Sequence, residues 1–104
     1  MTLQQFDAAL KEAFPDTYEL AAPKDKLRYV VWNKYGTQSH FGDDRNVLGI
    51  PKVQIDIVSN IKDDLLVDDV CAALWLMGLS YSIESEGYDQ EYNAFRTILQ
   101  LEVV

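Results

Sequence analysis

The spacing of apolar residues changes period along this chain, and that change most constrains the fold. Two stretches repeat apolar residues every three to four positions, as a half-buried helix does, and four others alternate or run together as in strands. The predicted helices cover 3–14 and 63–77, and the predicted strands cover 27–33, 53–58, 79–83 and 95–103. The order αββαββ predicts an α+β fold, with an antiparallel or mixed sheet of about four strands and both helices on one face. No linker or internal repeat is seen, so residues 1–104 are expected to form one domain.

Both predicted helices have recognisable ends. Thr2 and Gln5 have the spacing of a capping box, and Pro15 ends the first helix because the residue before a proline is disfavoured in the helical region. Gly78 stands where a left-handed cap should end the second helix. Four aspartates complement the positive N-terminal end of that helix: Asp63, Asp64, Asp68 and Asp69.

The second helix has an unusually wide apolar stripe. Its main row consists of Leu66, Val70, Ala73, Leu74 and Met77. We expect this row to form the centre of the core. Val67, Cys71 and Trp75 extend the stripe to a second side. Part of this helix is therefore expected to be covered by another subunit.

Four segments lack a clear period. Residues 16–26 are expected to form an irregular connection, and the polar residues 34–46, which include two glycines, a loop or a long hairpin arm. The Gly49-Ile50-Pro51 sequence suggests a bulge or a sheet-edge position, because proline cannot donate a hydrogen bond to a neighbouring strand. Residues 84–90 are expected to form a polar turn that closes the last hairpin.

The charge of the chain limits its partners. A formal net charge of −8 argues against binding to a nucleic-acid backbone, which requires clustered Lys and Arg. The charge is uneven: residues 24–62 hold four acids and seven bases, whereas 63–104 hold nine acids and one base. This asymmetry would suit subunits that meet head to tail, and an uneven solvated surface is the alternative explanation.

No group of residues has the pattern of a catalytic, cofactor or metal site. His40 is the only histidine, no cysteine lies near it, and it is expected in a solvated loop. Cys71 is expected to act as a small hydrophobic residue. The paired aspartates lack the spacing of a calcium loop, and the acids between 84 and 91 cluster in one predicted turn. We therefore expect a protein that is not an enzyme and binds no cofactor or metal.

The cellular location is expected to be intracellular. A single cysteine excludes an internal disulfide. The N-terminus lacks the basic start and apolar run of a signal peptide, and no apolar stretch is long enough to span a membrane. We expect a soluble, cytoplasmic protein that is not secreted and does not bind a membrane.

The order of these segments resembles the tail-completion or tail-terminator proteins of long-tailed bacteriophages. An amphipathic helix comes first, followed by a strand at 27–32 and the aromatic and acidic sequence Phe41-Gly42-Asp43-Asp44. A strand at 53–58 then leads into the second helix. The resemblance continues through Tyr81-Ser82-Ile83-Glu84, Gly87-Tyr88-Asp89 and the final strand at 96–103.

This resemblance implies a structural role. Members of the family form a homo-oligomeric ring, usually of six subunits, that ends growth of the tail tube and joins it to the head. The implied partners are copies of this chain, the tail-tube protein and head-completion proteins. The implied location is the virion, and during assembly the cytoplasm of the bacterial host.

Subunit contacts are predicted on the second helix and on the segment 34–46. The predicted interface residues are Tyr35, Phe41, Asp43, Asp44, Arg45 and Trp75. Aromatic residues on a polar arm are suited to burial in an interface, although the rings of Tyr35 and Phe41 could instead fold back onto the sheet. The alternative function is a small, acidic, phage-type inhibitor that mimics nucleic acid and binds a host or defence protein, which the charge of −8 would suit.

Overall fold

The computed structural model describes residues 1–40 and 48–104. These residues form an α+β fold with two helices and a mixed sheet of five strands. The helices are α1 (Leu3–Ala13) and α2 (Leu66–Leu76). The strands are β1 (Thr17–Glu19), β2 (Arg28–His40), β3 (Leu48–Ser59), β4 (Tyr81–Asp89) and β5 (Ala94–Glu102). The predicted class is confirmed, but the predicted number of strands and the order αββαββ were wrong by one strand.

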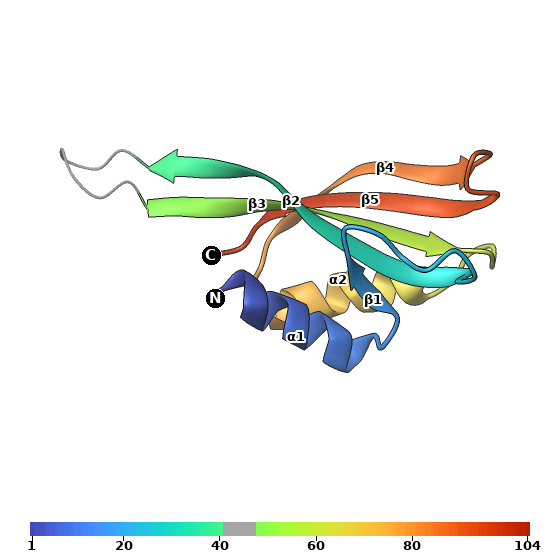
Figure 1. The fold of residues 1–104 in the computed structure, drawn as a ribbon, viewed down its shortest axis with the longest axis horizontal. Helices are drawn as coiled ribbons and strands as arrows, with labels where there is room; N and C mark the ends of the chain where they lie inside the picture. Colours follow the sequence, from blue (N-terminus) through green and yellow to red (C-terminus); the bar gives the residue numbers. More distant parts are fainter. Residues whose placement is uncertain (41–47) are drawn as a thin grey trace.

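The sheet has the strand order β1-β2-β3-β5-β4, and Figure 1 shows α1 and α2 on the same side of it. Only β1 runs parallel to its neighbour, while the other three strand pairs are antiparallel. β1 lies in the segment 16–26, which was expected to be irregular. It has only three residues, so alternation could not reveal it, and it is held by pairing with residues 30–32. The buried Thr17 also donates a hydrogen bond to the Phe14 carbonyl, at 2.6 Å.

The core lies between the two helices and one face of the sheet. Leu66, Val70 and Leu74 of α2 are buried in it, as the apolar row of this helix predicted. From α1, Phe6 packs edge-on against Trp32 of β2, with ring centroids 5.5 Å apart. The other buried core residues are Leu10, Val30, Val53, Ile55, Ile57, Leu79, Leu99, Leu101 and Val103.

The predicted helix ends are largely confirmed. The capping box is present: the Gln5 amide donates to the Thr2 hydroxyl at 3.1 Å, and the Thr2 amide donates to the Gln5 side chain at 2.9 Å. Gly78 has a φ of 77°, and the amides of Gly78 and Leu79 donate to the carbonyls of Trp75 and Leu74. These two bonds are the pattern of a Schellman cap.

α2 begins at Leu66, three residues later than predicted. Asp63 has a φ of 56° and therefore belongs to the turn and not to the helix. The Asp64 carboxylate accepts a hydrogen bond from the Leu66 amide at 3.0 Å. Asp68 and Asp69 lie in the first turn, where negative charge is favourable.

β2 and β3 form a long hairpin whose outer part extends beyond the rest of the sheet (Figure 1). The segment 34–46 was expected to be a loop or a hairpin arm, and its residues 34–40 belong to β2. They were not recognised as a strand because they are polar, yet they pair with β3, for example Thr37 with Pro51. Residues 41–46 of that predicted segment lie within 41–47, outside the described residues.

Pro51 does not interrupt β3. It lies one residue beyond Lys52, the last β3 residue paired with β5, and its carbonyl accepts a hydrogen bond from the Val103 amide at 3.0 Å. The N–H and C=O of a strand residue point to the same side, so the donor missing from Pro51 faces away from β2. The expected edge position was wrong, since β3 lies between β2 and β5, and the irregularity in pairing is on β2, between Lys34 and Gly36.

The turn predicted at 84–90 was wrong. Residues up to Asp89 belong to β4, and the turn is at 90–93. A register shift between Ile83 and Ser85 interrupts the alternation, so the residues after it do not follow the pattern set by Tyr81 and Ile83.

Candidate functional site

The described residues contain no group of three or more His, Cys, Asp or Glu side chains arranged to hold a metal ion. Among the described helices, none combines the length and apolar character needed to cross a bilayer. Cys71 is half-buried and packs against the core, as expected of a small hydrophobic residue. Three features of the described surface are candidates for a functional site: two strand edges and one side of α2.

The first feature is the edge strand β4. Its residues from Tyr81 to Tyr88 are all exposed. Tyr81 pairs with Leu101 and Ile83 pairs with Leu99, and both partners are buried on the helix side of the sheet. Cross-strand partners share a face, so Tyr81 and Ile83 also project on the helix side. The helices leave these apolar side chains uncovered, and Ile83 is 51% exposed.

The second feature is the side of α2 that lies toward β4. Trp75 is 79% exposed and lies one helical turn beyond Cys71. Tyr81 begins β4 only five residues after the end of α2, and the Cys71 thiol raises the pKa of its phenol. We call Cys71, Trp75, Tyr81 and Ile83 the α2–β4 apolar surface.

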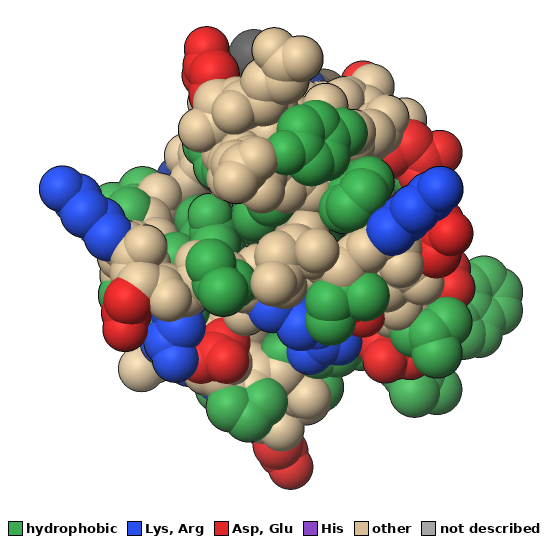
Figure 2. Space-filling model, turned by 90° about the vertical axis from the view of Figure 1, so that its right-hand side faces the viewer, with side chains coloured by type: hydrophobic (Ala, Val, Ile, Leu, Met, Phe, Trp, Pro, Cys, Tyr) green, Lys and Arg blue, Asp and Glu red, His purple; other side chains and the backbone are tan. Residues whose placement is uncertain are grey.

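A hollow of about 480 Å³ lies farther along the same side of the sheet, between the start of α2 and the second half of β4. Ile57, Val67 and Phe95 line it with apolar surface, while Asp68 and Glu86 add negative charge. Figure 2 views the molecule from the end that carries the β4–β5 turn, where hydrophobic side chains lie among acidic and basic ones. The helix side of β4 is thus partly apolar and acidic.

The third feature is the outer part of β2. β1 pairs only with residues 30–32, so within the described chain residues 33–38 have a strand neighbour on one side only, β3. We call residues 33–38 the open β2 edge. Tyr35 lies on it, is 46% exposed, and its hydroxyl donates to the Gln100 side chain at 3.4 Å.

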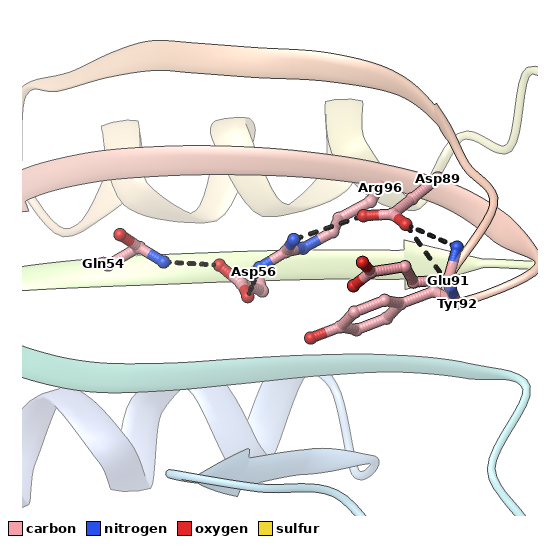
Figure 3. A network of polar contacts seen from close by, with 6 residues as sticks. All are labelled: Gln54, Asp56, Asp89, Glu91, Tyr92 and Arg96. Carbon is pink, nitrogen blue, oxygen red and sulfur yellow. Dashed lines mark hydrogen bonds and ion pairs between the residues drawn. The ribbon is translucent and has the colours of Figure 1, made fainter.

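The face of the sheet opposite the helices carries a polar network centred on Arg96 (Figure 3). The Arg96 guanidinium donates to Asp56 at 2.6 Å and to Asp89 at 3.3 Å. It also lies over the Tyr92 ring, 4.6 Å from its centroid. The other Asp89 carboxylate oxygen accepts hydrogen bonds from the Glu91 and Tyr92 amides, at 2.9 and 3.3 Å.

This network is structural. Burial alone would lower the pKa of Arg96, but hydrogen bonds to Asp56 and Asp89 raise it, so the guanidinium stays charged. Because Asp56 is on β3 and Asp89 ends β4, the network ties three strands to the 90–93 turn. Arg96 was not predicted as a structural residue, although it is the only base beside nine acids in residues 63–104, which was a usable signal.

The predicted interface residues have different outcomes. Tyr35 and Trp75 are exposed, but the structure does not bring them together. Tyr35 reaches toward Gln100, which is paired with Ser82 on the face opposite the helices, whereas Trp75 is on α2. The remaining predicted residues lie outside the described residues: Phe41, Asp43, Asp44 and Arg45. The exposed apolar residues of β4 were not predicted as interface residues, because their alternation indicated only one strand of the closing hairpin and not its place at the edge of the sheet.

Comparison with known proteins gives no relative for this chain: no family model matches it, and no curated protein matches it. Proposals about its function therefore rest on the surfaces described above and on the pattern of its sequence.

Proposed function

We propose that this chain is a structural subunit that assembles with copies of itself into a ring, and that the ring caps the tail tube of a long-tailed bacteriophage and joins it to the head. The single observation that carries the proposal is the α2–β4 apolar surface. It is left exposed beside an uncovered strand in a chain with no metal-ligand cluster among its described residues.

Trp75 is central to this argument. An indole that is 79% exposed leaves a large apolar area in water, and tryptophan is among the residues that most often dominate the energetics of protein interfaces. Tyr81 and Ile83 add exposed apolar area on the helix side of β4. Several exposed apolar residues on one side of a molecule mark a protein-contact surface more often than an isolated exposed residue does.

The shape of the hairpin also supports assembly. β2 and β3 stay paired with each other beyond Lys52, where the pairing of β3 with β5 ends. The molecule is accordingly elongated, with dimensions of 49, 26 and 22 Å. Such an arm buries little in its own subunit and is available to reach a neighbour. The resemblance of the segment order to tail terminators is the reason for proposing this particular assembly.

The ion pairs favour the ring over the nucleic-acid mimic. A mimic needs carboxylates that remain available over one broad face. Among the described residues, five acids are instead paired with bases of the same chain: Asp7, Asp16, Asp56, Asp64 and Asp89. The negative charge of these five carboxylates is therefore largely neutralised by bases of the same subunit.

Negative-stain microscopy of the concentrated protein, alone and with tail tubes from the same phage, tests the proposal. The expected result is a ring with a central hole, or a density that caps the end of a tube. Tubes that stay bare, together with single subunits at every concentration, would contradict it.

A further inference from the structure

We propose that neighbouring subunits join through their sheets: β4 of one copy pairs with the open β2 edge of the next copy, in a head-to-tail arrangement. This inference rests on the proposed ring and specifies the contact that builds it. It assigns a role to two of the strand edges that the described residues leave unpaired.

β4 offers a full strand for such pairing. It has nine residues, bonds to β5 on one side, and within the described chain has no strand on its other side. An unpaired strand edge presents a row of N–H and C=O groups that binds another extended segment. The open β2 edge, residues 33–38, presents a second row of unpaired backbone N–H and C=O groups.

The directions of the strands fit this joint. β2, β3, β5 and β4 alternate in direction, since each adjacent pair is antiparallel. β4 therefore runs opposite to β2. Two copies in the same orientation place β4 antiparallel to the neighbour's β2, with the helices of both copies on the same side. The antiparallel alternation would then continue across the joint without a break.

The charges of the two edges are complementary. β4 contains Glu84 and Glu86 and no base, whereas the open β2 edge contains Lys34 and no acid. Glu86 pairs with the buried Thr97, and Lys34 pairs with the buried Val53, so both charged side chains project on the helix side of the sheet. In a joint sheet they would lie on one face and attract each other.

The same charges disfavour pairing of two β4 strands. That contact would bring the glutamates of one copy close to those of the other, and like charges across a strand pair are destabilising. The charges of β4 therefore disfavour pairing with a second β4 strand and favour pairing with the open β2 edge.

Within one subunit, β4 and the open β2 edge lie at different positions along the strand direction. Tyr81, the first residue of β4, pairs with Leu101, which pairs with Val53, and Val53 pairs with Lys34. Tyr81 and Lys34 therefore lie on the same line across the sheet. The rest of β4 therefore lies beside residues 28–34, and a neighbour must shift along the strands by roughly 15–20 Å to meet residues 33–38. A stagger of this kind is needed when tilted strands close into a cylinder. A contact between two different surfaces forms rings if the rotation closes.

Cysteine cross-linking tests this joint. In a Cys71→Ala background, the double variant Thr37→Cys/Glu86→Cys carries one exposed thiol near each edge and is treated with a short bismaleimide. The matched control, Thr37→Cys/Lys62→Cys, moves the second thiol to an exposed residue in the turn after β3. Circular dichroism checks the fold of each variant, and light scattering measures its assembly without the reagent.

The expected result is a ladder of dimers, trimers and larger species in the double variant only. Dimers from the single variant Glu86→Cys would overturn the inference, since they require two β4 strands to meet. If the double variant assembles but is not cross-linked, the β4–β2 joint is wrong, although the proposed ring is not contradicted. Variants that remain monomeric by light scattering, also with tail tubes present, would overturn both the joint and the ring.

Discussion

Arg28 and Asp64 form two hydrogen bonds, 2.6 Å from Nε and 3.0 Å from Nη2, that join the first residue of β2 to the turn before α2. Asp64 also accepts hydrogen bonds from the Ser59 hydroxyl and the Leu66 amide. These donors hold the pKa of Asp64 well below its ordinary value of 3.8, and the hydrogen bond from Arg28 has the largest effect. Burial acts in the opposite direction and raises this pKa. One carboxylate therefore fixes the start of α2 relative to the sheet.

Replacing Asp64 should destabilise the subunit in a pH-dependent way. Asp64→Asn removes the charge and is expected to cost roughly 1–3 kcal/mol near neutral pH, as for loss of a hydrogen-bonded, largely buried partner. Because the folded-state pKa is lowered, this stabilisation is present in full above the ordinary, unfolded-state pKa and is lost as the pH falls through the lower folded-state pKa. Urea unfolding of both proteins from pH 7 down to pH 3 measures this. A stability difference that does not shrink with acid would contradict the assignment.

The position of α2 in the core gives a second prediction. Leu74→Ala removes a fully buried side chain and should lower the free energy of unfolding by about 2–5 kcal/mol. Leu76→Ala is the matched control, since Leu76 is 85% exposed two residues away and should change stability by less than about 0.5 kcal/mol. Equal denaturation midpoints for the two variants would show that α2 had been placed wrongly.

Much of this core could be predicted from the sequence. Thr2, Gln5 and Gly78 each act within a few residues, so their signals are local and α1 and the end of α2 were identified. β1 was not identified, because a three-residue strand is stabilised by its neighbour β2 and not by a pattern of its own. The outer part of β2 was left ambiguous for a similar reason: its polar residues are in a strand only because β3 pairs with them.

The candidate site was less predictable than the fold. Of the residues that widen the apolar stripe of α2, Val67 and Cys71 pack against the core and Trp75 is exposed, so coverage of this helix by another subunit stays a prediction. The exposure of Tyr81 and Ile83 depends on which strand lies at the edge of the sheet, and strand order is a long-range property that alternation does not encode. The Arg96 network likewise joins residues far apart in sequence, with Asp56 and Arg96 forty positions apart.

Trp75 should matter for assembly and little for folding. Trp75→Ala is expected to weaken self-association by roughly 2 kcal/mol or more, as for an aromatic residue at the centre of an interface. Because the side chain is exposed in the subunit, the free energy of unfolding should change by less than about 0.5 kcal/mol. Sedimentation velocity and urea unfolding measure the two quantities, and Leu27→Ala, another exposed apolar residue, serves as the control. Loss of stability with intact association would place Trp75 in the core.

Charge reversal at the two strand edges should be compensatory. Lys34→Glu or Glu86→Lys alone should each weaken association by roughly 0.2–1 kcal/mol, the range for an exposed ion pair, and less so at high salt. The double reversal should recover most of the loss, because each joint then again contains opposite charges. Light scattering at low and high salt measures this. Additive weakening in the double variant would indicate that these two residues do not face each other.

The most direct test of the central claim is native mass spectrometry of the assembled protein, prepared across a range of concentrations. A closed ring of identical subunits predicts one dominant complex at a fixed multiple of the 11.9 kDa subunit mass, with six the expected number, and few intermediates between it and the monomer. A ladder that grows with concentration without stopping would indicate open filaments. Only the 11.9 kDa species at every concentration, together with no complex on tail tubes, would contradict the ring.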